Sequence, residues 1–312
     1  MAKGYFNRAR LCAQSSRGGI SMRNWRKISI LFAGTLTFAG AASRQEPQEN
    51  RVLTHREQAP IVYRWIEKRF DTLLPGLMRR EGIDMWIIVS REYNDDPVFR
   101  SMAPLTTYAS RRRTILFFFD RGGEQPVERL SIGRFDYEGL YEVHKTSNDE
   151  QWEGLRRVVE ERDPKVIGIN TSDTWYHADG LTFTEHDKLM NALTPKYAAR
   201  VISAEHLAVG WLEVKLPEQT DMYRHVMQVA HRVIAEAFSN RVIVPGQTTT
   251  ADVEWWMRQR VAELRLGQWF HPSVCIQRRG ELPEEGEPGY DVIERGDFLH
   301  CDFGIRYLGL AT

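Results

Sequence analysis

The sequence predicts an α/β domain over residues 52–210, followed over residues 211–312 by the first half of an α+β domain. Two observations lead to this prediction. In the first stretch, short apolar runs typical of buried strands alternate with segments whose apolar residues recur at helical spacing, which is the order expected of an α/β fold. In the second stretch, two amphipathic helical segments come first and two strand-like segments follow them.

The elements of the α/β domain follow from local patterns. Apolar residues recur at helical spacing from Ala59 to Arg80, and Gly82 follows as a stop. Met85–Val89 has the length and composition of a buried strand. Asp120–Gly123 separates two further apolar runs and is a hairpin signal. The expected helices cover residues 59–80, 151–162 and 185–193, and the expected strands cover residues 85–89, 114–119, 127–132, 166–169 and 200–202.

The second domain is expected to open with a long helix at Pro217, because proline fits the first helical turn. The sequence Val242–Gly246 breaks the helical pattern. Thr249 and Asp252 have the spacing of a capping box, which predicts a second helix that runs to about Leu266. The expected strands cover residues 268–277 and 297–307, and an acidic loop over residues 278–291 separates them.

The last expected strand alternates with a period of two. Its core face consists of Leu299, Cys301, Phe303, Ile305 and Tyr307. The opposite face carries Asp302 next to Gly304, which indicates a place where another group approaches the sheet closely. We expect Leu308 and Gly309 to turn the chain into a hairpin partner. Because the sequence stops at Thr312 beside an apolar strand with an open edge, we also expect the chain to be truncated.

Composition and charge limit the classes of function. The chain has 312 residues with 42 basic and 42 acidic side chains, so its formal charge is zero. Residues 1–43 contain seven basic residues and no acidic one, which leaves 35 basic against 42 acidic residues in the remainder. Nucleic-acid binding needs surplus positive charge. The remainder of the chain is therefore not expected to bind nucleic acid.

Residues 1–43 are predicted to be a leader that contains a signal peptide starting at Met22. The basic stretch Met22–Lys27 precedes an apolar run, Ile28–Ala42, which closes on small residues suited to a signal peptidase. The run is shorter than the roughly 20 residues that a spanning helix needs. We therefore expect a periplasmic or secreted protein with no stable membrane span after cleavage. The alternative is an uncleaved membrane anchor.

Three segments together resemble the pita-bread metallohydrolases, which include Xaa-Pro aminopeptidase, prolidase, creatinase and methionine aminopeptidase. They are Lys215–Arg224, Ile243–Thr249 and Gly296–Gly309. The last is similar to the family's pattern of Gly-Asp, four residues, Asp-x-Gly and then Tyr-x-Gly. The resemblance implies that residues 211–312 are an incomplete pita-bread catalytic domain. The preceding α/β domain resembles the N-terminal domain of the creatinase and prolidase branch.

In this family five side chains hold two divalent metal ions, which activate water and polarise the scissile carbonyl. The resemblance implies Mn, Co or Zn as the metals. Asp302 is similar to the first of the five ligands, and the other four would lie beyond Thr312. The resemblance therefore implies a hydrolase of which this chain holds one ligand. We expect these 312 residues by themselves to be inactive.

The sequence departs from the family pattern beside the expected site. Family peptidases have a substrate-facing His upstream of the first Asp, and the corresponding position here is Glu285. His271 is the nearest His upstream and is the candidate catalytic residue; the alternative is a His that packs against a strand. His300 shares the face of Asp302, and it is the candidate for orienting a metal ligand.

The resemblance implies hydrolysis of the peptide bond on the amino-terminal side of a proline. Two alternatives remain open: a noncatalytic relative whose α/β domain dimerises or binds a peptide, and a creatinase-like enzyme that cleaves a C–N bond. The expected partners are a peptide or small C–N substrate and a second copy of the chain. We interpret Arg111–Arg113 as solvent-exposed residues at the start of a strand. The alternative is a phosphate-binding patch.

Overall fold

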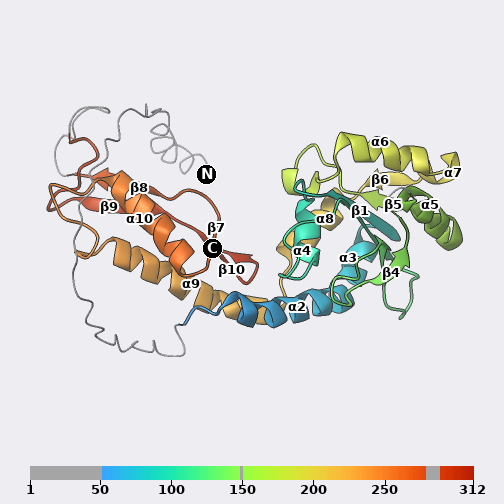
Figure 1. Cartoon of the computed structure of the whole chain (residues 1–312), viewed down its shortest axis with the longest axis horizontal. Helices are drawn as coiled ribbons and strands as arrows, with labels where there is room; N and C mark the ends of the chain where they lie inside the picture. The colour runs from blue at the N-terminus through green and yellow to red at the C-terminus, as the bar shows by residue number, and fades with distance from the viewer. Residues whose placement is uncertain (1–50, 148–149, 279–288) are drawn as a thin grey trace, which may run out of the picture. The chain divides into compact units, whose positions relative to one another are not determined.

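The computed structural model describes residues 51–147, 150–278 and 289–312 (Figure 1). These residues form two compact units. We call residues 53–224 with 307–310 the α/β unit, and the described parts of residues 225–306, with residues 51–52 and 311–312, the carboxy-terminal unit. The predicted leader with Met22, and also Glu285, lie outside the described residues. In the described ranges, none of the helices combines the length and hydropathy that a membrane crossing requires.

The α/β unit alternates helices and strands along the chain. Its helices are α2 (His55–Thr72), α3 (Leu74–Arg80), α4 (Pro97–Met102), α5 (Gln151–Arg162), η2 (Tyr176–Ala178), α6 (Phe183–Ala192), α7 (Pro195–Ala198) and α8 (Glu205–Glu213). Its strands are β1 (Met85–Arg91), β2 (Arg113–Phe119), β3 (Glu128–Gly133), β4 (Glu142–Lys145), β5 (Ile167–Ile169) and β6 (Val201–Ser203). These strands form one mixed sheet in the order β4-β3-β2-β1-β5-β6.

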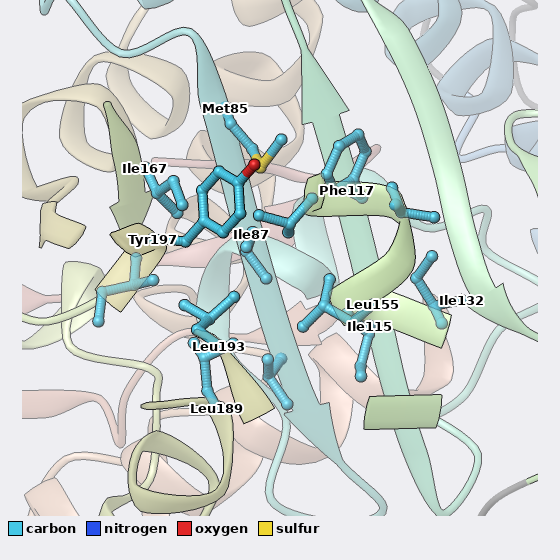
Figure 2. Close-up of a cluster of buried hydrophobic side chains, with 14 of the residues drawn as sticks. Met85, Ile87, Ile115, Phe117, Ile132, Leu155, Ile167, Leu189, Leu193 and Tyr197 are labelled. Carbon is cyan, nitrogen blue, oxygen red and sulfur yellow. The ribbon is translucent and has the colours of Figure 1, made fainter. Parts of the chain in front are cut away.

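Strand β1 lies in the middle of this sheet. It pairs antiparallel with β2 and parallel with β5. On one face its side chains Met85, Ile87 and Val89 pack into an apolar cluster with α5, α6 and Tyr197 (Figure 2). Trp86, on the opposite face, is also fully buried. Both faces of β1 are therefore covered, as its continuous apolar run predicts.

Aromatic side chains cover the second face of the sheet. The ring of Phe70 in α2 stacks on that of Trp211 in α8, with centroids 5.3 Å apart, and lies 5.5 Å from the ring of Phe118. The guanidinium of Arg69 lies 4.3 Å above the Trp211 ring, and burial lowers the pKa of Arg69 to about 10. No helix was expected at α8. Its buried residues Leu207, Ala208 and Trp211 do recur at helical spacing, and Trp211 packs on Phe70.

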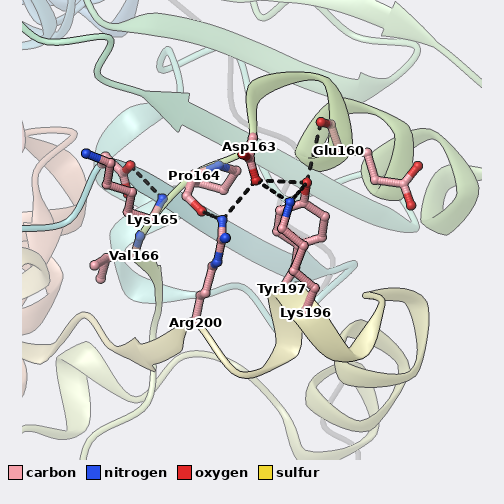
Figure 3. Close-up of polar contacts among 9 residues, drawn as sticks. Glu160, Asp163, Pro164, Lys165, Val166, Lys196, Tyr197 and Arg200 are labelled. Carbon is pink, nitrogen blue, oxygen red and sulfur yellow. Dashed lines mark hydrogen bonds and ion pairs between the residues drawn. The ribbon is translucent and has the colours of Figure 1, made fainter.

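Asp163 connects the end of α5 to the segment that leads into β6 (Figure 3). Its Oδ1 accepts hydrogen bonds from Lys196 Nζ at 2.7 Å, Arg200 Nη1 at 3.0 Å and the Tyr197 hydroxyl at 3.1 Å. These donors, Lys196 first, lower the pKa of Asp163 to about 2. The carboxylate is therefore ionised at every physiological pH and keeps its partners.

The predicted helix over residues 59–80 is in fact two helices. The first begins earlier than expected, at His55, because Thr54 and Glu57 form a capping box. The break falls at Leu73, and Pro75 lies in the first turn of α3. A proline is tolerated there because the first amides of a helix have no intrahelical partner.

The carboxy-terminal unit contains most of one long helix, the whole of a second helix and a hairpin. The elements of this part of the chain are α9 (Pro217–Ala237), α10 (Thr250–Glu263), β7 (Gly267–Gln268), β8 (Ser273–Gln277), β9 (Phe298–Asp302), β10 (Ile305–Tyr307) and β11 (Leu310–Ala311). Val233 of α9, Val253 and Met257 of α10, and Val274 of β8 belong to one buried cluster. Both predicted helix starts, including the capping box of Thr249 and Asp252, are confirmed.

Each of the two predicted strands in this unit is interrupted. The segment Trp269–Pro272 separates β7 from β8, and Phe303–Gly304 separates β9 from β10. Strand β10 pairs with β7 and, after the turn at Leu308 and Gly309, with β11. Both turn residues have positive φ, 56° and 73°. This is the backbone conformation that a two-residue hairpin turn requires. The predicted hairpin is therefore confirmed.

Candidate metal site

The β8–β9 hairpin carries the predicted metal ligand at one end. The strands are antiparallel, with Ser273 opposite Asp302 and Cys275 opposite His300. The backbone amide of Val274 donates a hydrogen bond of 2.8 Å to Glu254 Oε1 on α10. The helix therefore fixes the position of the strand that pairs with Asp302.

Asp297, the first acid of the motif, holds the other end of the hairpin. Arg278 donates to both of its carboxylate oxygens at 2.7 Å and to the carbonyl of Val292 at 2.8 Å. The backbone amide of Glu294 donates to Asp297 at 2.7 Å. The hydrogen bonds from Arg278 lower the pKa of Asp297. The ion pair of Arg278 and Asp297 therefore joins the end of β8 to the start of β9.

Gly304 lies where a side chain has no room. A β-carbon at this position would lie 2.9 Å from ring atoms of both Trp269 and Phe270. The expected close approach beside Asp302 is therefore made by two aromatic residues of the same chain. They come from the segment between β7 and β8, so the two interruptions of the predicted strands lie next to each other.

The carboxylate of Asp302 lies exposed at the end of β9. Within residues 51–147, 150–278 and 289–312 it makes no hydrogen bond or ion pair. After burial, its negative charge is the second cause of the raised pKa of the neighbouring Cys301. An exposed, unpaired carboxylate is a hard oxygen donor of the kind that divalent cations prefer. The side chain fits the position of one metal ligand.

His300 lies on the same outward face of β9. It is exposed, like Phe298 and Asp302, whereas Leu299 and Cys301 pack against the apolar cluster of the unit. The predicted alternation of β9 is therefore confirmed. In the part of the chain that the structure describes, no hydrogen bond joins His300 to Asp302. Its assignment as an orienting residue stays a prediction.

His271 lies against α10. Its Nε2 is 3.5 Å from Glu254 Oε2, and its Nδ1 is 3.4 Å from Arg258 Nη1. The centroid of its ring is 5.4 Å from that of Trp255. Among the described residues, no hydrogen bond or ion pair joins His271 to Asp302. The catalytic assignment of His271 also stays a prediction.

Sequence reasoning missed Glu254, the residue that connects these features. It accepts the Val274 amide and lies beside His271. Its spacing from Arg258, four residues along one helix, is a visible signal for a shared helix face. Its strand partner, 20 residues away, depends on how helix and hairpin pack. No spacing in the sequence shows that contact.

The described residues do not bring a set of metal ligands together. No group of three or more His, Cys, Asp or Glu side chains in these ranges could hold a metal ion. A protein site for a divalent cation usually supplies about three or more ligands. Asp302 therefore fits as one member of such a set.

Comparison with known proteins agrees with the motif. Residues 221–312 match the family model of Metallopeptidase family M24. Two curated proteins, from Mycoplasma genitalium and Mycoplasma pneumoniae, bear names of Xaa-Pro aminopeptidases and are 28% identical to this chain over 134 residues. The match covers 43% of this chain and 35% of each relative, so the chain spans about a third of the length of these relatives.

Solved structures share the fold at low sequence identity. The zinc-substituted aminopeptidase P of E. coli in complex with product has a TM-score of 0.53 and 11% identity, over 83% of this chain and 61% of that one. The X-Pro aminopeptidase of Thermotoga maritima has a TM-score of 0.50 and 18% identity, over 76% and 62%. By the family match, residues 221–312, which include the motif of residues 296–309, are similar to the pita-bread metallopeptidase family M24, and the chain shares the fold of the solved aminopeptidases.

Proposed function

We propose that the chain is part of a metal-dependent peptidase that cleaves the bond on the amino-terminal side of a proline. The observation that carries the proposal is the Asp302 carboxylate, exposed and unpaired among the described residues, at the motif position of a family metal ligand. The family match and the names of the similar proteins support the substrate class.

In this proposal the residues of the chain have separate tasks. Asp302 would hold a metal ion, and Asp297 with Arg278 would keep the hairpin that carries it closed. Two divalent ions such as Mn, Co or Zn, when bound, would supply an activated water and a polarised scissile carbonyl. Because one carboxylate cannot hold two ions, we expect no peptidase activity from these 312 residues alone.

Titration of the chain with Mn²⁺ tests the role of Asp302. We expect one weak site, and the substitution Asp302→Asn should weaken its binding by roughly tenfold or more, because a neutral amide is a poorer cation ligand. Asp291→Asn, at another exposed acid of the same unit, is the matched control and should leave binding unchanged. Two tight sites on this chain, or equal affinity in Asp302→Asn, would contradict the proposal.

The reaction is tested on a form of the protein that carries the remaining four ligands. With Mn²⁺ we expect hydrolysis of an Xaa-Pro dipeptide and no turnover of creatine. Turnover of creatine alone would favour the creatinase-like alternative. A folded protein that binds Xaa-Pro peptides without cleaving them would favour the noncatalytic alternative.

We propose further that the protein is exported, to the periplasm or the medium, and forms a homodimer. The basic stretch and the apolar run after Met22 support export. Mass spectrometry of the exported protein should find an amino terminus just after the small residues of positions 39–43. A protein that keeps this segment and stays with the membrane would instead be anchored. Size-exclusion chromatography with light scattering tests the dimer.

A further inference from the structure

We infer that the α/β unit carries a binding site for a small anion joined to an aromatic or apolar group. The site consists of two adjoining surface pockets between the ends of β1, β2 and β3. An arginine pocket of about 330 Å³ is lined by Arg111, Arg112, Arg134 and Phe135. An aromatic pocket of about 390 Å³ shares Arg111 and Phe135 with it and also includes Tyr93 and Tyr108. The inference does not depend on the proposed peptidase activity.

Two of the three guanidinium groups that line the arginine pocket have no ion pair among the described residues, and the third has one long, exposed ion pair. Of the three consecutive arginines, only Arg113 is committed to a buried partner, Glu185, at 2.6 Å. The nearest acid to Arg111 is Glu92, at 3.7 Å, and the Arg111 side chain is 67% exposed. The guanidinium groups of Arg112 and Arg134 have no ion pair within the described ranges.

Several guanidinium groups around one pocket repel each other unless an anion lies between them. The planar fork of a guanidinium matches the geometry of a carboxylate or a phosphate and can donate two hydrogen bonds to it. The residues that line the arginine pocket include no acid, whereas Glu92, Asp136 and Glu138 line the adjoining aromatic pocket. This end of the site therefore fits the anionic group of a ligand.

The aromatic pocket presents exposed rings on a fixed backbone. Tyr93 and Tyr108 are 81% and 84% exposed, which is unusual for large side chains. The backbone that carries Tyr108 is nevertheless held in place, because Arg100 donates to its carbonyl and the amide of Ser110 donates to Asp95 at 2.8 Å. Solvent-facing rings on a backbone that is held in this way offer a surface on which a planar or apolar group can stack.

The backbone around the site is strained. Four of the seven non-glycine residues with positive φ in the described ranges border these pockets: Tyr93 at 62°, Arg112 at 55°, Tyr137 at 53° and Glu138 at 64°. Such residues are uncommon and collect where a protein positions side chains for a ligand. Hydrogen bonds hold the strained turn, one between Tyr137 and Thr114 at 2.8 Å and one from Thr106 to Glu138.

Binding of small anions to the full chain tests this inference. The probes are phenyl phosphate and phenylacetate, with inorganic phosphate, acetate and benzyl alcohol as their separate halves, measured by calorimetry at low ionic strength. We expect at least one of the two joined probes to bind roughly tenfold or more tightly than either of its halves. Whichever of the two binds better identifies the anionic group as phosphate or carboxylate.

Substitutions of the lining residues test whether the probe binds at this site. The double substitution Arg112→Gln with Arg134→Gln should weaken binding of the better probe by roughly tenfold or more. Tyr108→Ala should reduce the affinity for this probe to that for the bare anion. Arg156→Gln, at an exposed arginine on α5 that pairs with Glu153 and Glu160, is the control and should leave binding unchanged. Circular dichroism checks that each variant is folded.

Three outcomes would overturn the inference. The first is that neither joined probe binds. The second is that each joined probe binds no better than its bare anion, which would mean that the rings are not used. The third is equal binding in the folded arginine variant and in the native chain.

Discussion

At the scale of single residues, Gly304 determines how closely an aromatic segment can lie against the strand that follows Asp302. The β-carbon of any other residue would lie 2.9 Å from both Trp269 and Phe270. Such a contact forces the rings or the backbone to move. The glycine of the Asp-x-Gly pattern therefore has a packing role in this chain.

We predict that Gly304→Ala lowers the free energy of unfolding of the carboxy-terminal unit by about 1–3 kcal/mol, because it overpacks this contact. Urea unfolding followed by tryptophan fluorescence measures the loss. The control is Gly76→Ala in α3, where a β-carbon would meet nothing within 4 Å. That substitution should be neutral or stabilising by about 0.5–1 kcal/mol. Equal stability of Gly304→Ala and the native chain would show that the rings adjust freely.

The position of Asp302 could be predicted from the motif, and so could its place on the outward face of β9. The arrangement of the residues around Asp302 could not be predicted from the motif. The contacts of His271 with Glu254 and Trp255 join a helix to a loop. A motif fixes spacing along one segment, whereas such contacts depend on how separate segments pack. The same limit applies to Asp297, whose partner Arg278 lies across a loop.

At the scale of elements, helix starts were predictable where a local hydrogen bond defines them. Thr249 accepts the amide of Asp252 at 3.1 Å, and Asp252 in turn accepts the amide of Thr249 at 2.9 Å. Both residues of this box lie within one turn, so the sequence shows them directly. Helix α8 has no such cap, and the break between β9 and β10 lies against rings from another segment. The helix had only a short apolar pattern as a signal, and the break could not be predicted locally.

We predict that Thr249→Ala destabilises the carboxy-terminal unit by about 1 kcal/mol, because the first turn of α10 loses its cap. The next residue, Thr250, lies inside the helix and offers a matched control. Thr250→Ala should change stability by less than about 0.5 kcal/mol or increase it slightly. Thermal unfolding by circular dichroism compares the two variants. Similar losses in both would mean that the capping box contributes little.

At the scale of the molecule, one buried carboxyl group gives the stability of the α/β unit a pH dependence of unusual direction. Asp96 is fully buried and accepts hydrogen bonds from the Val98 amide at 2.7 Å and from Asn170 at 3.0 Å. Asn170 in turn accepts the indole N–H of Trp86 at 2.8 Å. Burial raises the pKa of Asp96 to about 6, and its hydrogen bonds offset only part of this effect.

A raised pKa means that the folded chain binds the proton of Asp96 more tightly than the unfolded chain does. Its contribution to stability is therefore fully present below the ordinary pKa of 3.8 and is lost as the pH rises through about 6. Between pH 4 and 7, Asp96 should lower the unfolding free energy of the native chain by at most about 3 kcal/mol. We predict that this decrease is absent from the variant Asp96→Asn. Urea unfolding at several pH values measures the slope.

Asp187→Asn, at an exposed acid on α6, is the control for this pH series and should keep the native slope. An unchanged slope in Asp96→Asn would show that Asp96 has its ordinary acidity. The direction of the effect also matters, because most paired acids stabilise a fold at higher pH and this one does the opposite.

The position of β1 in the α/β unit has a consequence for how the unit exchanges its amide hydrogens with solvent. This strand has a neighbour on each side and packed side chains above and below, whereas β4 and β6 are the outer strands of the sheet. Local opening starts where few contacts must break. Deuterium should therefore enter at the two edges first, and the amides of residues 85–89 should keep their protons until the whole unit unfolds.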